Sequence, residues 1–261
     1  MSNIDVSFLI SSAFKPYEQY GKRVIDSIHN IDSTGFSYEI LYSSPEEPPE
    51  KGIIWHKDNI MRGSIPAYNE LIKISKANYI SVLTDDHLLS PNFFDVLYFL
   101  ESSLFANREY KICTLASGIV GQNIQSPPVR LPEVFGPGWK NDWRKLPPYL
   151  VMRFPVASME TIKNNLDGYI FHPCFCRHFA DNYLGLYLGD NDEPGLECPK
   201  ATMAVMPESI EFQKSLDVYL PYFKDMGPKF YDESYLECIK LLKEYKKGMK
   251  YSVQIDDEVL K

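Results

Sequence analysis

The sequence predicts an α/β fold in which helices flank a mainly parallel, Rossmann-like sheet. Short apolar runs of strand length alternate with amphipathic helical patterns, and turn residues close each run. Hydrophobic residues make up 44% of the 261 positions, which is enough to bury a sizeable core. We find no internal repeat and no clear linker, so a single domain is expected.

The first half of the chain supplies most of this pattern. Four apolar runs, each followed by turn or polar residues, predict strands over residues 6–11, 38–42, 52–56 and 79–83. Apolar spacing and Ser–Pro start signals predict helices around residues 24–31, from Ser64, and from Ser90 through about residue 105. This order of elements is typical of a layered α/β sheet.

The second half is less regular. Apolar runs predict strands near residues 111–115 and 149–154, and a loop rich in Pro, Gly and Trp separates them. A helix is expected over residues 182–188, and apolar spacing predicts another within 230–249. The later helix also has a basic face, so contact with a membrane surface is an alternative to docking on the core.

Composition limits the classes of partner. The formal charge of −8 disfavours broad binding to nucleic acids or anionic lipid. No apolar stretch approaches the roughly 20 residues that span a bilayer. Five thinly spread cysteines and the lack of a secretory signal favour a reduced, cytoplasmic protein that is at most peripheral to a membrane. Aromatic residues, at 14%, suit sugars and bases but also fill ordinary cores.

Polar residues follow three of the predicted strands: Ser11–Ser12, Ser43–Ser44 and Thr84–Asp85–Asp86. Ligands of parallel sheets collect beyond the carboxyl ends of the strands. Two adjacent carboxylates repel each other there, and a bound Mg²⁺ or Mn²⁺ ion would compensate them. The alternative interpretation is that Asp85 and Asp86 only cap a turn or face solvent.

The sequence around these carboxylates resembles the family 2 glycosyltransferases, which have the GT-A fold. The matching segments are VSFLIS (6–11), RVIDSIHNI (23–31), YEILYSS (38–44), DNIMRGSIPAYNELIKIS (58–75) and ANYISVLTDDHLLSPNFF (77–94). In this register Thr84 replaces the first acid of the family's DxD-type motif, and Asp86 occupies its metal-binding last position. The resemblance therefore implies Mn²⁺ or Mg²⁺ on Asp86, with His87 as an alternative ligand and Asp85 against the ribose or donor sugar.

The resemblance extends into the second half through ASMETIKNNLDGYI (157–170) and HFADNYLGLYLGD (178–190). Asp181 matches the family's catalytic aspartate, which takes the proton of the acceptor hydroxyl. From the local sequence alone, Asp181 is equally well explained as an N-cap. Asp190 and Asp192 are rival candidates for the base.

Two departures from the family pattern affect the expected donor site. The family's acidic pair after the second strand, which helps to hold the base, is replaced by Ser43–Ser44–Pro45. Ser11, Ser12 and Ser43 are the expected substitutes, and Glu46 lies nearby in the sequence. The basic residue that often follows the catalytic aspartate is also missing, so Arg62 and Lys57 are the candidates for the diphosphate.

Three residues are candidates for the acceptor site. Trp139 and Trp143 can stack on a sugar, and anchoring of their loop is the alternative role. His172 can face the acceptor, but it also alternates with Cys174, Cys176 and His178. That spacing would suit zinc on one strand face, although we favour a buried, thiol-lined strand.

The resemblance as a whole implies an inverting transferase that moves a sugar, most simply from a UDP-sugar donor, to an acceptor hydroxyl. We expect a GT-A domain over residues 1–205, with a donor half at 1–107 and an acceptor half at 108–205, and a helical extension at 206–261. The alternatives are a degenerate protein that binds nucleotide or glycan without turnover, and a sugar nucleotidyltransferase. Against the latter, residues 11–23 lack a glycine-rich phosphate loop. The sequence does not define an oligomeric state.

Overall fold

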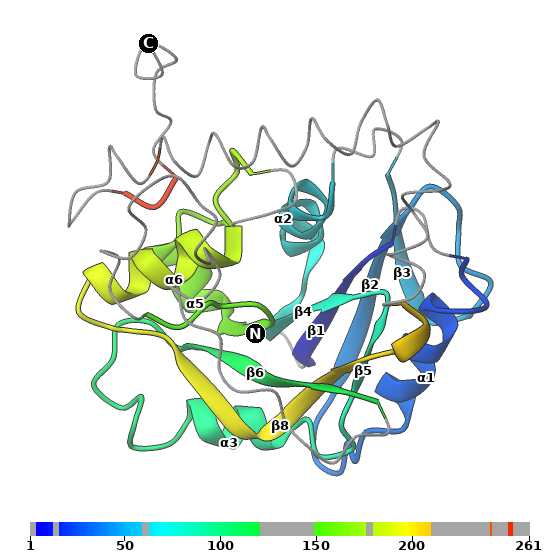
Figure 1. Cartoon of the computed structure of the whole chain (residues 1–261), viewed down its shortest axis with the longest axis horizontal. Helices are drawn as coiled ribbons and strands as arrows, with labels where there is room; N and C mark the ends of the chain where they lie inside the picture. The colour runs from blue at the N-terminus through cyan, green and yellow to red at the C-terminus, as the bar shows by residue number, and fades with distance from the viewer. Residues whose placement is uncertain are drawn as a thin grey trace.

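The computed structural model describes residues 4–12, 16–58, 63–120, 149–175, 180–209, 241 and 250–252. Within these ranges, eight strands form one sheet in the order β3-β2-β1-β4-β7-β6-β8-β5 (Figure 1). The strands are β1 (Ile4–Ser11), β2 (Tyr38–Ser44), β3 (Ile53–Lys57), β4 (Ala77–Thr84), β5 (His87–Leu89), β6 (Ile112–Ile119), β7 (Pro155–Ser158) and β8 (Leu196–Val205). The helices are α1 (Gly21–His29), α2 (Ser64–Ile74), α3 (Asp95–Leu100), α5 (Met159–Asn165) and α6 (Ala180–Asp190).

The α/β prediction is confirmed, and the sheet has a parallel part and a mixed part. Strands β3, β2, β1 and β4 pair in parallel, so their carboxyl ends share one edge. Beyond β4 the pairings β4–β7, β7–β6 and β8–β5 are antiparallel, whereas β6–β8 is parallel. The parallel part is therefore the one that follows the predicted strand–helix alternation.

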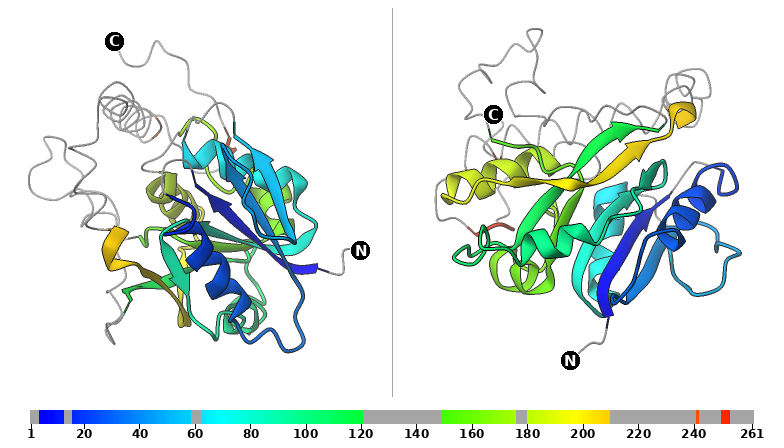
Figure 2. Two further views of the ribbon diagram at one scale, coloured as in Figure 1. Left: turned by 90° about the vertical axis from the view of Figure 1, so that its right-hand side faces the viewer. Right: turned by 90° about the horizontal axis from the view of Figure 1, so that it is seen from below.

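Helices cover both faces of the sheet, and the alternation of side chains along each strand explains why. In β1, Phe8 and its same-face neighbours pack in the buried cluster that contains α1 and α3. Leu9 points to the other face and packs in the cluster that contains α2, α5 and α6. Figure 1 and the right-hand view of Figure 2 show α1 and α6 at opposite ends of the molecule.

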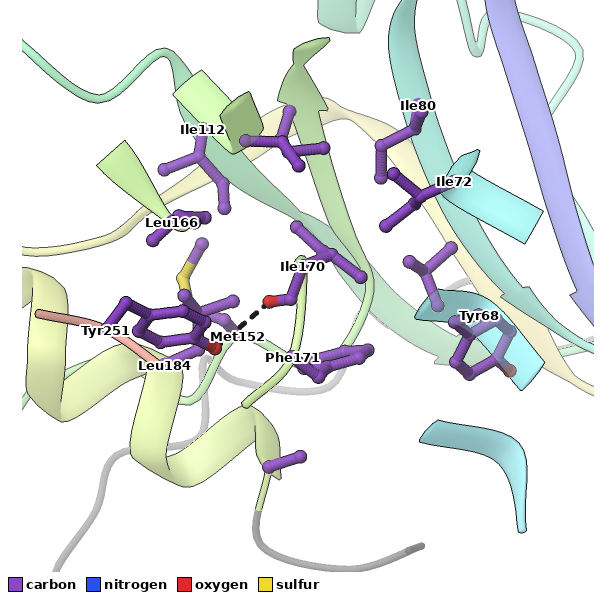
Figure 3. Close-up of a cluster of buried hydrophobic side chains, with 14 of the residues drawn as sticks. Tyr68, Ile72, Ile80, Ile112, Met152, Leu166, Ile170, Phe171, Leu184 and Tyr251 are labelled. Carbon is purple, nitrogen blue, oxygen red and sulfur yellow. Dashed lines mark hydrogen bonds between the residues drawn. The ribbon is translucent and has the colours of Figure 1, made fainter. Parts of the chain in front are cut away.

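A late segment of the chain completes the second cluster. Tyr251 is fully buried, and its hydroxyl donates to the carbonyl oxygen of Ile170 at 3.1 Å, as Figure 3 shows. The next residue, Ser252, donates from both its backbone N–H and its hydroxyl to the Asp167 carboxylate. Met152 and Leu184 pack in the same cluster, so this segment is fixed to α6 and to the strand region before β7.

The helix expected over residues 90–105 is much shorter than predicted. Helix α3 covers only Asp95–Leu100, and turns lie on either side of it. The reason is that Ser90 forms hydrogen bonds with Thr202 of β8 instead of capping a helix. Its N–H donates to the carbonyl of Thr202, and its hydroxyl accepts from the Thr202 N–H. After Leu100, bonds such as Ser102 N–H to Phe99 carbonyl close tight three-residue turns.

Other boundaries in the second half also differ from the predictions. The strand expected at 149–154 is wrong: β7 begins at Pro155, because the backbone N–H of Met152 bonds to the start of α6 and that of Phe154 bonds to the Thr114 hydroxyl. Strands β5 and β8 were not expected at all. The thiol-lined strand expected around His172 is an irregular turn in its described part.

Helix α6 confirms the helix expected at 182–188 and extends it at both ends. The helix expected within 230–249 lies almost wholly outside the described residues, and so does most of the extension beyond residue 205, whose boundary stays a prediction. Among the described helices, none has the length and apolar character needed to cross a bilayer.

Gly185 allows α6 to approach the segment before β7, and its replacement is a test of this packing. A Cβ at position 185 would overlap the backbone carbonyl oxygen of Leu150, which cannot move like a flexible side chain. We expect Gly185→Ala to lower the free energy of unfolding by about 1–3 kcal/mol, measured by urea denaturation. Lys163→Ala, at an exposed position on α5, is the control and should change stability by less than about 0.5 kcal/mol. Equal stability of both variants would contradict this close contact.

Candidate functional site

The polar residues after β1, β2 and β4 meet at one edge of the sheet, as the parallel register requires. Ser11 pairs with Ser43 on one side and with Thr84 on the other. The backbone N–H of Ser12 donates to the carbonyl of Ser43 at 2.9 Å. This edge therefore gathers the strand-end residues that the sequence pointed to.

Asp85 is held at this edge by Ser12. The Ser12 hydroxyl donates to Oδ2 of Asp85 at 2.7 Å, and both side chains are buried. The negative charge of Asp85 also affects the pKa values of two nearby tyrosines. Burial is the main cause that raises the pKa of Tyr42 and of Tyr68, and the negative charge of Asp85 raises both further. The hydroxyl of Tyr68 donates to the Leu83 carbonyl at 2.8 Å, which fixes α2 against the end of β4.

Asp86 lies in a compact hydrogen-bonded group. Its Oδ1 is 2.6 Å from Nδ1 of His87, and the same Nδ1 is 2.6 Å from the hydroxyl of Thr84. Its Oδ2 accepts from the Ser209 hydroxyl at 2.5 Å, and its backbone carbonyl accepts from the Met206 N–H. Asp86 is only 3% exposed. Residues from β4, β5 and the segment after β8 thus fix one carboxylate.

The donor atoms of this group fit a divalent cation in part. Two ligands at adjacent corners of an octahedron with bonds of about 2.1 Å lie about 3 Å apart. Oδ1 of Asp86 and Nδ1 of His87, at 2.6 Å, need only a small separation to reach that spacing. An imidazole ligand favours Mn²⁺ over Mg²⁺. Among the residues described, no group of three or more His, Cys, Asp or Glu side chains converges, so substrate oxygens and water would complete the shell.

His56 and Trp55 were not identified from the sequence, although they lie at the same edge. His56 pairs with Ser43 in register, and its Nδ1 is 3.2 Å from the Ser43 hydroxyl. The indole N–H of Trp55 donates to the Ser44 carbonyl at 3.2 Å. Both side chains are half-buried. The sequence could have revealed them. His56 ends the predicted third strand and Ser43 follows the predicted second strand, so parallel pairing of these two strands places both residues at one edge.

Asp181 lies in the first turn of α6. Its Oδ1 accepts from the backbone N–H of Asn182 at 3.0 Å, and its side chain is half-buried. Burial raises the pKa of the Asp181 carboxyl, although that hydrogen bond and the positive charge of Arg153 oppose the shift. A carboxylate with a raised pKa is a stronger base, which is the property that proton abstraction from a hydroxyl requires.

A short segment connects Asp181 with the Asp86 group. The backbone N–H of Met152 donates to the Asp181 carbonyl at 3.2 Å. Two residues later, the ring of Phe154 lies 4.8 Å from the imidazole of His87, centroid to centroid. Residues 152–154 therefore link the backbone at the start of α6 to the imidazole of His87.

The rival carboxylates lie at and beyond the far end of α6. Asp190 ends α6, nine residues after Asp181, and a helix rises about 1.5 Å per residue, so their Cα atoms are about 13 Å apart. Asp192 follows in a turn, with a φ of 66°, and is exposed.

The side-chain N–H of Asn182 is a buried donor with no acceptor among the described residues. The residue is 5% exposed, and its side-chain Nδ2 has no hydrogen-bond partner in the part of the chain that the structure describes. Leaving such a group unpaired costs about 1–3 kcal/mol.

The remaining candidates are one buried residue, Lys57 at the exposed end of β3 beside Ser44, and several residues that lie outside the described ranges. His172 is 1% exposed, and its ring contacts the rings of Tyr183 and Tyr251 at centroid distances of 5.2 and 5.8 Å. Its Nδ1 lies 3.3 Å from the donating N–H nitrogen of Cys174. His172 is therefore packed inside the protein, and its acceptor role stays a prediction. Arg62, Trp139, Trp143, Cys176 and His178 lie outside the described residues.

No protein-family model matches the sequence, and no curated protein matches it either. Solved structures do match the fold. Residues 1–349 of S. aureus TarS in complex with UDP superpose with a TM-score of 0.51 at 11% identity, over 98% of this chain and 76% of that one. Another structure of the same TarS fragment gives a TM-score of 0.50 at 13% identity, over 82% and 64%.

The structure of the longer TarS chain gives a TM-score of 0.50 at 11% identity, over 98% of this chain and 46% of that one. This protein thus spans less than half of the longer TarS chain. The chain has a GT-A-like fold. Identities this low establish the fold alone. In a GT-A-like fold, the edge that holds Ser12, Asp85 and Asp86 is the carboxyl edge of the parallel strands, where such sheets bind their ligands.

Proposed function

We propose that this chain is a metal-dependent glycosyltransferase of family 2, which transfers a sugar from a UDP-linked donor to an acceptor hydroxyl with inversion at the anomeric carbon. The observation that carries the proposal is the meeting of Ser12, Asp85, Asp86 and His87 at the carboxyl edge of the parallel strands. The fold is shared with a TarS fragment crystallised with UDP, which supports a nucleotide donor at that edge.

In this proposal the donor lies across the ends of β4, β1, β2 and β3. Asp85, oriented by the Ser12 hydroxyl, accepts hydrogen bonds from the hydroxyls of the ribose or the donor sugar. Ser11 and Ser43 contribute polar groups at the neighbouring strand ends. The Ser43–His56 pair takes the place of the acidic pair expected for the base, since an imidazole can hydrogen-bond the edge of uracil. Arg62 and Lys57 are the proposed contacts for the diphosphate.

Asp86, with His87 as second ligand, would hold Mn²⁺ or Mg²⁺ against the diphosphate. When bound, the ion neutralises the charge that grows on the leaving group. The chain's own contribution is to fix the carboxylate in advance: the hydroxyl of Ser209 and the Met206 N–H hold Asp86 from the side of β8. A positioned ligand loses little conformational entropy when it acts.

Asp181 is the proposed general base. Its carboxylate takes the proton of the acceptor hydroxyl while that oxygen attacks the anomeric carbon, and the bond from this carbon to the diphosphate oxygen breaks with its electron pair. Asn182 donates its unused side-chain N–H to an oxygen of the bound substrate. Trp139, Trp143 and His172 remain the proposed residues on the acceptor side.

A thermal-shift screen tests the donor part of the proposal. UDP, ADP, GDP, CDP and their glucose or N-acetylglucosamine conjugates are tested at 1 mM with Mn²⁺, with Mg²⁺ and with EDTA. A ligand at 100 times its Kd adds about 2.7 kcal/mol to stability, which raises the melting temperature by roughly 5 °C or more for a chain of this size. We expect the largest shift for uridine nucleotides with metal. Equal shifts for all four bases, or none, would contradict a UDP-dependent site.

A non-catalytic binding protein is the second candidate function. The observation that favours it is that both oxygens of Asp86 already have a polar partner, His87 Nδ1 at 2.6 Å from Oδ1 and the donating Ser209 hydroxyl at Oδ2, while Thr84 replaces the first acid of the motif. The measurement that separates the two functions is release of UDP from UDP-sugars over a panel of acceptors. Metal-dependent UDP binding with no release above the background rate would favour the binding protein.

A further inference from the structure

A cavity lies at the end of the parallel strands that is opposite the proposed donor site. It is open to solvent and has a volume of about 360 Å³, which lies within the range of small-molecule sites. Its walls come from the loop before β2 and from the turn that leads into α3, near the lower edge of Figure 1. Strand β2 separates the two ends by six residue steps of about 3.3 Å, so the cavity is about 20 Å from the Ser43 edge.

Three aromatic rings form one wall of this cavity. Phe36 stacks on Phe94, with centroids 4.7 Å apart and planes 7° from parallel, and Tyr98 meets Phe36 edge to face at 5.5 Å. Phe94 is buried, whereas Tyr98 is 65% exposed. The outer ring is therefore held in place by the inner pair, and it presents its surface to a ligand at little further entropic cost.

Two carboxylates form the polar side of the cavity. Asp32 is oriented by Thr34, whose backbone N–H and hydroxyl donate to its Oδ1 at 3.1 and 2.7 Å. These two hydrogen bonds lower the pKa of Asp32, which favours its ionised form. The Oδ2 of Asp95 lies 3.5 Å from the side-chain nitrogen of Asn92. In the described part of the chain, neither carboxylate forms an ion pair with Lys, Arg or His.

The residues that line the cavity include no basic side chain, so its field is negative. A nucleotide or another anion is therefore disfavoured there. A bare metal ion is also disfavoured, because the described residues supply no third acidic, His or Cys ligand. Aromatic faces next to carboxylates instead suit an organic cation, whose charge is attracted by the rings and by the acids together.

We propose that this cavity binds a small organic cation that carries a primary or methylated ammonium group. The ammonium lies against the rings of Phe36 and Tyr98, and its charge is balanced by Asp32 and Asp95. The carbon atoms of the ligand pack on the exposed ring of Tyr98. This site is independent of the proposed glycosyl transfer, because it shares no residue with the strand-end site.

The experiment is a titration of the full chain with choline, with butylamine and with 3,3-dimethyl-1-butanol, the neutral isostere of choline. Binding is followed by isothermal calorimetry and by shifts of the backbone amide resonances in NMR. We expect a Kd for at least one cation in the roughly millimolar range and binding of the neutral isostere at least about tenfold weaker. Comparing choline with butylamine identifies whether the site prefers a methylated or a primary ammonium.

Three variants test the assigned residues. Asp32→Asn and Asp95→Asn remove one charge each, and Tyr98→Ala removes the exposed ring; each should weaken cation binding about threefold or more. Asp26→Asn is the matched control, because it removes one exposed charge on α1 outside the cavity and should leave the Kd unchanged. Melting temperatures show whether each variant is folded.

Four outcomes would overturn the proposal. These are no saturable binding of either cation up to about 50 mM, equal binding of the neutral isostere, binding that all three variants leave unchanged, and an equal loss of binding in Asp26→Asn, which would indicate a diffuse charge effect. None of these outcomes bears on the UDP-dependent thermal shift, so this proposal and the proposed function can fail separately.

Discussion

Replacing Asp86 by alanine is expected to abolish metal-stimulated sugar transfer. The carboxylate lies 2.6 Å from Nδ1 of His87. Among the described residues, no other acidic side chain contacts this nitrogen, so none is placed to replace Asp86 as a metal ligand beside His87. Loss of several kcal/mol of leaving-group stabilisation corresponds to a fall in kcat of about 1,000-fold or more. The measurement is UDP release with and without Mn²⁺, and the stimulation by metal should disappear together with the activity.

Two further variants separate chemistry from folding at this position. Asp86 is buried and accepts from Ser209, so alanine can also disturb local packing. Asp86→Asn keeps the shape, and it should lose metal stimulation while retaining its melting temperature within a few degrees. Ser209→Ala removes one hydrogen bond to the carboxylate but keeps the ligand, and should retain activity within about tenfold. Turnover of Asp86→Asn at the wild-type rate, with or without metal, would show that Asp86 is not the metal ligand.

Asp181→Asn is expected to lower the transfer rate about 100- to 10,000-fold while leaving donor binding unchanged, because the amide cannot take the acceptor proton. Asparagine still accepts from the Asn182 N–H and still suits the first turn of a helix. The melting temperature should therefore not fall. Asp190→Asn and Asp192→Asn are the controls, and each should retain nearly full activity. If either control loses more activity than Asp181→Asn, the assignment of the base is wrong.

The pH dependence of the rate gives a second test of Asp181. A general base acts only when it is deprotonated, so the rate falls as the pH drops through the pKa of the group. Burial raises the pKa of Asp181, so the fall in rate should begin at a higher pH than the pKa of about 4 for an ordinary aspartate would give. The measurement is kcat/KM against pH for the wild type and for Asp181→Asn. The residual kcat/KM of Asp181→Asn should not show this fall at low pH.

The sequence predicted the carboxyl edge of the parallel strands well, because that part of the fold depends on local patterns. Ser12 and Asp85 each follow an apolar run, and parallel pairing alone brings them within 2.7 Å. Asp86 itself was found in the same way. Its partner Ser209 was not, because 123 residues separate the two and no local pattern links them.

Strand β8 shows why the second half was harder to predict. Its sequence LECPKATMAV contains a proline and a lysine, and its pairing with β6 shifts register between Leu115 and Ala116. An irregular pairing of this kind hides the alternation of apolar and polar residues that identifies a strand. Asn182 was missed for a different reason: an unpaired buried amide is visible only when its surroundings are known.

The burial of Tyr251 has a consequence for how the chain folds during synthesis. Its hydroxyl bonds to a carbonyl 81 residues earlier, and its ring fills the space between His172 and Tyr187. The cluster around α6 therefore stays incomplete on the ribosome until residue 251 has left the exit tunnel. The pairings of β1 with β2 and of β1 with β4 lie within the first 84 residues and can form much earlier. The parallel part of the sheet is thus able to form first, and the packing around α6 is completed only when Tyr251 joins the cluster.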